Sequence, residues 1–77
     1  MKMNKVLFEE KWPLMRGTVN ARWSLMVERD LVKVDKADVM YDKFTTMLQV
    51  KYGYTRQQAR EEIAKLWQEY LSKNKEG

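Results

Sequence analysis

The chain has 77 residues, a net charge of +4 at neutral pH, and neither cysteine nor histidine. This composition excludes disulfide bridges, ordinary zinc sites, and catalysis by the usual near-neutral proton shuttle or thiolate nucleophile. A chain this short can bury only one small core, so we expect a single domain over residues 1–77, stabilised by helix packing.

The composition favours helices. Proline occurs once and glycine three times, and the apolar residues recur at steps of three and four rather than alternating. The sequence therefore predicts an all-α domain, a small bundle of about four helices. The first helix is expected over residues 4–11.

A second helix is expected over residues 13–26. Pro13 suits its first turn, because the amide that proline lacks would be unpaired there anyway. Gly17 indicates a local bend or the close approach of another segment. A weaker second stripe predicts that this helix is covered on both sides. The main stripe comprises Trp12, Met15, Val19, Trp23 and Met26, and the weaker one Leu14, Ala21 and Leu25.

A third helix is expected over residues 36–51, after a short turn at 28–32. Asp35 is predicted to cap it, and Asp38 would lie near the positive end of the helix dipole. The expected apolar face consists of Met40, Phe44, Met47 and Leu48, and Lys51 interrupts it. Val39, Tyr41 and Val50 would widen this face.

The stretch YGYTRQQ, residues 52–58, predicts a joint between two helices. Gly53 can end the third helix in a left-handed conformation, and Tyr54 would add the apolar contact that often closes such an end. Thr55 and Gln58 have the spacing of a capping box, which predicts a fourth helix over residues 56–72. Tyrosines on both sides of a glycine could instead form a ligand platform, but helix termination and initiation account for each residue.

Two segments, WPLMRGTVNARW and KYGYTRQQAREEI, together with Met26 to Leu31, resemble the CsbD-like family of small bacterial stress-associated proteins. The resemblance covers roughly residues 8–70. Val27, Val39 and Thr46 depart from the usual family pattern, so the chain looks like a diverged member. The resemblance implies a small helical bundle, a bacterial cytoplasmic setting and a link to general stress, and it implies no reaction.

The ionisable residues predict no catalytic, cofactor-binding or metal site. Adjacent carboxylates, as in Glu9-Glu10 and Glu61-Glu62, point about 100° apart on a helix and do not converge on a substrate. The aspartates at 35, 38 and 42 lack the glycine-containing, oxygen-rich loop of a calcium site. No apolar h-region of a signal peptide and no run of about 18 apolar residues occurs, so we expect a soluble protein, and the family resemblance implies that its location is cytoplasmic.

Two functional hypotheses follow. The first is a non-catalytic accessory protein that binds an unidentified protein or itself, with Tyr41, Tyr70 and Leu71 as the expected partner surface. The second is a weak electrostatic binder of nucleic acid or of an anionic membrane, whose basic patch would comprise Lys5, Lys11, Arg16 and Arg22, near Trp12 and Trp23. The first is favoured because acidic residues interrupt the bases along the chain, which disfavours nucleic-acid binding.

Overall fold

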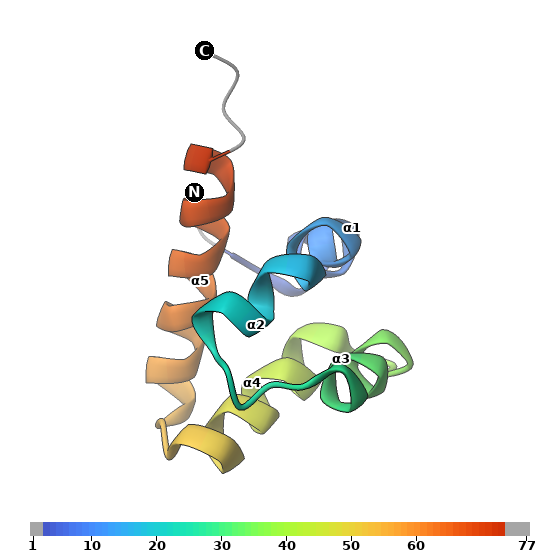
Figure 1. The fold of residues 1–77 in the computed structure, drawn as a ribbon, viewed down its shortest axis with the longest axis vertical. Coiled ribbons are helices and arrows are strands. Elements are labelled where there is room, and N and C mark those ends of the chain that lie inside the picture. Colours follow the sequence, from blue (N-terminus) through green and yellow to red (C-terminus); the bar gives the residue numbers. More distant parts are fainter. Residues whose placement is uncertain (1–2, 74–77) are drawn as a thin grey trace.

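Every regular element of the protein is helical within residues 3–73, the range that the computed structural model describes. Four longer helices form the bundle, which confirms the all-α class. In chain order the elements are α1 (Lys5–Met15), the 3₁₀ turn η1 (Arg16–Thr18), the single turn α2 (Val19–Arg22), α3 (Glu28–Asp35), α4 (Met40–Tyr52) and α5 (Arg56–Lys73) (Figure 1).

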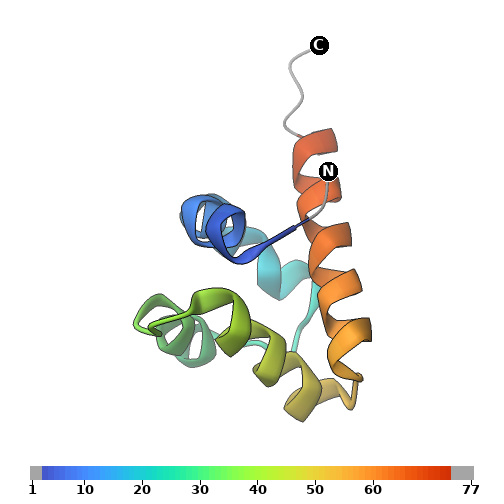
Figure 2. The ribbon, with the colours of Figure 1, turned by 180° about the vertical axis from the view of Figure 1, so that it is seen from behind.

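Helix α4 is the centre of the bundle, since it packs against α1, α3 and α5. Helix α5 stands along one side, and α1 and α3 both lie on the same side of it, as the front and back views agree (Figures 1 and 2). The carboxyl-terminal turns of α5 extend past the other helices. This part of α5 therefore has fewer helices around it than the part that meets α4.

The core is built around aromatic rings. The ring of Phe44 is fully buried, and its centroid lies 5.7 Å from that of Phe8, 5.4 Å from that of Trp12 and 5.5 Å from that of Trp23. The main apolar stripe predicted for residues 12–26 is buried throughout. Aromatic rings at these separations stabilise a core beyond the area they bury, by about 0.5–1.5 kcal/mol per pair.

The boundary predicted between the first two helices is wrong. Helix α1 does not end before Pro13 but continues through it to Met15. Asn4 caps α1, accepting a 2.8 Å hydrogen bond from the amide of Leu7. A proline this close to the end of a helix removes one intrahelical hydrogen bond and leaves little helix beyond it to distort. The chain bends instead at Gly17, where a side chain would meet no atom within 4 Å, so the glycine marks a bend rather than a close approach.

The second, weaker stripe is not covered. Leu14 and Leu25 are 52% and 53% exposed, and Ala21 is exposed as well. The helical path ends at Arg22, so Leu25 lies in the irregular link to α3. The α-helical spacing does not continue through the 3₁₀ turn and the loop. In those segments it therefore does not determine which side chains face the core.

Residues 28–35 form a two-turn helix, α3, where the sequence predicted only a short turn. Asp35 ends this helix and does not cap the next, which begins later than predicted, at Met40. Val27 has no polar side chain with which to cap α3, but its amide donates a 3.1 Å hydrogen bond to the carboxylate of Asp30. One half of a capping box is therefore enough to begin α3, together with its packing.

The joint at residues 52–58 has the geometry expected from its sequence. Gly53 ends α4 with φ 73° and ψ 18°, in the left-handed region. The amide of Thr55 donates to the side chain of Gln58 at 2.9 Å, and the amide of Gln58 donates to the hydroxyl of Thr55 at 3.0 Å. Tyr54 stacks on Tyr52 with ring centroids 5.7 Å apart and packs against the core. The tyrosines therefore serve helix termination.

We expect Gly53→Ala to lower the free energy of unfolding by about 1 kcal/mol, because only glycine takes a positive φ freely. A new side chain there would meet no atom within 4 Å, so backbone strain is the whole cost. Thermal unfolding should show a decrease of roughly 4–8 °C. Gly17→Ala is the control, since Gly17 has a negative φ and equal space, and it should be neutral or stabilising. Equal losses in both variants would contradict the assignment.

Candidate functional site

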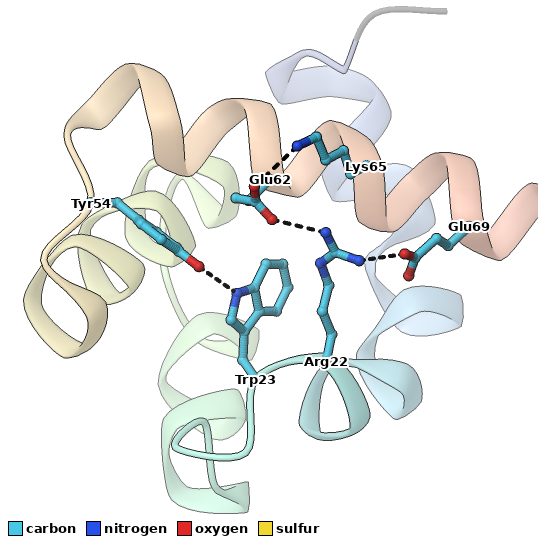
Figure 3. Close-up of polar contacts among 6 residues, drawn as sticks. All are labelled: Arg22, Trp23, Tyr54, Glu62, Lys65 and Glu69. Carbon is cyan, nitrogen blue, oxygen red and sulfur yellow. Dashed lines mark hydrogen bonds and ion pairs between the residues drawn. The ribbon is translucent and has the colours of Figure 1, made fainter.

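A network of ion pairs joins α2 to α5 (Figure 3). Arg22, the last residue of α2, donates to Glu62 at 2.8 Å and also binds Glu69, which lies two helical turns further along the same face of α5. Lys65 reaches Glu62 from the same helix at 3.3 Å. The guanidinium of Arg22 also lies 5.3 Å from the centre of the Trp23 ring. One arginine thus holds the short α2 turn against two turns of α5.

The charges in this network stabilise one another. The hydrogen bond from Arg22 lowers the pKa of Glu62 below its usual value. Partial burial would lower the pKa of Arg22, but its hydrogen bonds to Glu62 and Glu69 outweigh that effect and raise it. Arg22 and Glu62 are therefore both ionised at neutral pH.

A groove of about 430 Å³ lies beside this network, between α2 and the carboxyl-terminal half of α5. Small residues form one wall and larger ones the other, with charged groups among them. The lining residues are Gly17, Thr18, Ala21, Arg22, Leu66, Glu69, Tyr70 and Lys73. Leu71, which is 39% exposed, is the next residue of α5 after Tyr70. Of the three residues expected on a partner surface, Tyr70 therefore lines this groove, and Leu71 is exposed but is not among its lining residues.

Tyr41 does not belong to this surface, and its prediction is wrong. Its side chain is only 7% exposed and packs against Phe8, with ring centroids 5.5 Å apart. The guanidinium of Arg60 lies 5.4 Å from the centre of its ring. Burial raises the pKa of its hydroxyl. The cause is the packing of Phe8 from α1 over this part of α4, a contact 33 residues apart in the sequence that no local pattern predicts.

The four residues of the predicted basic patch are Lys5, Lys11, Arg16 and Arg22, and the structure does not bring them together. Lys5 pairs with Asp42 of α4, Arg16 pairs with α3, and Arg22 pairs with α5. The tryptophans expected beside them, Trp12 and Trp23, are 1% and 2% exposed. Stacking on bases therefore has no platform here, and three of the four cations already have carboxylate partners.

A second ion-pair cluster joins α1 and η1 to α3 through Asp35. The carboxylate accepts a 2.6 Å hydrogen bond from the indole N–H of Trp12 and a 2.9 Å hydrogen bond from Nε of Arg16. Arg16 also binds Glu28 at 2.6 Å. The hydrogen bond from Arg16, helped by that from Trp12, lowers the pKa of Asp35. This role replaces the helix cap that the sequence predicted for Asp35.

Asp30 makes a third such link, from α3 to α4. Its carboxylate is 2.8 Å from the ammonium of Lys51, the residue that interrupts the apolar face of α4. Burial would raise the pKa of Asp30, but the hydrogen bonds from Lys51 and from the amide of Val27 outweigh it and the pKa is lowered.

Acid should destabilise the protein through these carboxylates. Asp30, Asp35 and Glu62 have folded-state pKa values below their ordinary values of 3.8 for aspartate and 4.5 for glutamate. Their contribution is therefore complete above about pH 5 and is lost as the pH falls through the lowered values, because the unfolded chain takes up protons first. Melting temperatures measured from pH 7 to pH 2 should fall mainly below about pH 4.5. A flat profile in that range would contradict this assignment.

The three aspartates considered as cation ligands, Asp35, Asp38 and Asp42, lie on different segments. Asp35 ends α3, Asp38 lies in the link to α4 and Asp42 is in the first turn of α4. Within residues 3–73 no three potential ligands from histidine, cysteine, aspartate and glutamate are placed to hold a metal ion. In the same range no helix combines the length and apolarity needed to cross a membrane.

Comparison with known proteins places these features in context. No family model matches the chain, and no solved structure matches it. The chain is similar to the UPF0337 protein pc0632 of Protochlamydia amoebophila (strain UWE25), with 30% identity over 74 residues. This match covers 95% of the chain and the whole of the relative.

Proposed function

Since the chain belongs to the UPF0337 family, which is the CsbD-like family, we propose that it is a non-catalytic accessory protein of the bacterial stress response. Its proposed location is the cytoplasm, and its proposed action is to bind another protein. The groove between α2 and α5 is the observation that supports this role. The stress setting comes from the family resemblance, and the binding role comes from the geometry.

The use of the ionisable groups favours a role without catalysis. The carboxylates with lowered pKa values, Asp30, Asp35 and Glu62, each accept hydrogen bonds from a cation on another element. A general acid or base needs a pKa near the working pH, which for a carboxyl group means a raised value. These carboxylates are shifted the opposite way, so they suit the role of linking helices.

The groove suits a helix of a partner protein. Gly17 and Ala21 on one wall have little or no side chain, which allows a close approach, while Leu66 and Tyr70 offer apolar contact on the other. Arg22, Glu69 and Lys73 supply charges of both signs, which an amphipathic helix can match. The proposed partner is therefore an amphipathic helix with mixed charge beside its apolar face.

A photoreactive residue in place of Lys73, which lines the groove and is exposed, tests this proposal when the protein is expressed at its native level. We expect discrete cross-links to a defined protein that disappear when Ala21→Trp fills the groove. Ala21 is exposed, so this change should not disturb the fold. Val50→Trp is the matched control, since Val50 is 79% exposed on α4, and it should leave the cross-link intact. Sedimentation of the pure protein shows whether a second copy is the partner. A cross-link that persists in Ala21→Trp would refute the groove as the site.

A further inference from the structure

A second groove, of about 700 Å³, lies where the start of α1 meets the beginning of α4 and the first half of α5. This volume is within the range of small-molecule sites in proteins, roughly 300–1,000 Å³. Met3, Tyr41 and Ala64 give it an apolar part, and Lys5, Arg56 and Arg60 line it with positive charge. It shares no lining residue with the groove between α2 and α5.

One carboxylate serves all three cations. Asp42 is 3.6 Å from the ammonium of Lys5, 3.5 Å from Arg56 and 3.3 Å from Arg60. The other ion pairs between helices are shorter. In the pair of Arg22 with Glu62, for example, the nitrogen and oxygen atoms are 2.8 Å apart. A single carboxylate cannot neutralise three cations or offer each a short hydrogen bond, so the cluster keeps an excess of positive charge.

The remaining groups leave this excess in place. Glu61 also lines the groove, but the hydrogen bond that its carboxylate accepts comes from the neutral amide of Gln57, at 3.2 Å. Even with Glu61 counted, three positive charges face two negative ones. Arg56 is held by a 2.9 Å hydrogen bond to Gln49, while Arg60 and Lys5 reach a carboxylate only through long contacts to Asp42, and Arg60 also lies over the ring of Tyr41. Arg60 and Lys5 are therefore the cations best able to turn to a ligand.

We propose that this groove binds the phosphate group of a small phosphomonoester. The guanidinium of Arg60 and the ammonium of Lys5 would contact the phosphate oxygens, because arginine forks and lysine ammonium groups are the usual phosphate ligands of proteins. Arg56 supplies further positive charge from a fixed position. Met3 and Ala64 would contact the organic part of the ligand. The cations gather in one concave site rather than along a stripe, which favours a small molecule over a nucleic-acid backbone.

Titration of the ¹⁵N-labelled protein with phenyl phosphate tests the proposal, with chemical shifts followed by NMR. We expect saturable shifts at residues of this groove, and weaker binding of inorganic phosphate because it lacks the apolar part. Arg60→Gln should weaken phenyl phosphate binding about tenfold, the value of one hydrogen bond to a charged group. Arg29→Gln, which removes the same charge from an exposed residue of α3, should leave binding unchanged.

The Asp42→Asn variant distinguishes a change at the binding site from damage to the fold, because the two should change the affinity for phenyl phosphate in opposite directions. Loss of the competing carboxylate should tighten phenyl phosphate binding, whereas a damaged fold would weaken it. Equal weakening by Arg29→Gln and Arg60→Gln would overturn the proposal, because it would indicate general attraction between charges. Weaker binding to an Asp42→Asn protein whose amide spectrum shows the intact fold would overturn it as well. Equal affinity for inorganic phosphate, or binding only to vesicles of phosphatidic acid, would exclude a small phosphomonoester as the ligand.

Discussion

Phe44→Ala is expected to lower the free energy of unfolding by about 3–5 kcal/mol, the usual loss when a buried phenylalanine is truncated. The ring of Phe44 is fully buried and touches Phe8, Trp12 and Trp23, which come from α1 and from the segment after α2. Its removal would leave a cavity at the one place where these elements meet α4. Since small domains are stable by about 5–15 kcal/mol, this loss would remove a large part of the total stability.

Urea denaturation followed by tryptophan fluorescence measures this loss. The control is Val50→Ala on the same helix, because Val50 is 79% exposed and a surface change of this kind should alter stability by no more than about 0.5 kcal/mol. A Phe44→Ala protein that unfolds at the same urea concentration as the Val50→Ala protein would show that the aromatic cluster is not the centre of the core.

Asp35→Ala should cost about 1–3 kcal/mol, because it leaves the indole N–H of Trp12 buried without its acceptor. Trp12 is 1% exposed and donates to Asp35 at 2.6 Å, so water has little access to the freed group. The same change releases Arg16, which binds both oxygens of that carboxylate. Thermal unfolding of the purified variant measures the loss.

Two further variants separate the causes. Asp35→Asn keeps an oxygen that can accept from Trp12 but loses the charge that pairs with Arg16, so its loss should be smaller than that of Asp35→Ala. Asp38→Ala removes an exposed aspartate three residues away and should have little effect. If Asp35→Asn were as unstable as Asp35→Ala, the ion pair with Arg16 would be the main contribution of Asp35.

The sequence predicted best where the determining interactions are local. The end of α4 and the start of α5 depend on Gly53, Thr55 and Gln58, whose partners lie within four residues. The role of Asp35 depends instead on distant contacts. Asp35 carries the side chain of a good helix cap, but its carboxylate instead accepts hydrogen bonds from Trp12, 23 residues away, and from Arg16, 19 residues away. The helix-capping preferences of Asp35 and its sequence neighbours could not reveal those partners.

The candidate site was predictable only in part. Tyr70 and Leu71 could be placed near the edge of the apolar face of α5 from helical spacing, but only Tyr70 lines the groove. Glu62 and Glu69, seven residues apart, also share a face of that helix by spacing alone. Their common partner, Arg22, is 40 residues from Glu62, and no local pattern connects them. The groove depends on how α2 is oriented after the bend at Gly17.

The joint between α4 and α5 also bears on the order in which the protein folds. Three residues, Gly53 to Thr55, separate the two helices, so bringing the helices together costs little loop-closure entropy. The signals that end one helix and begin the next act within the joint itself. We therefore expect the α4–α5 hairpin to form the folding nucleus, with the amino-terminal helix docking after the rate-limiting step.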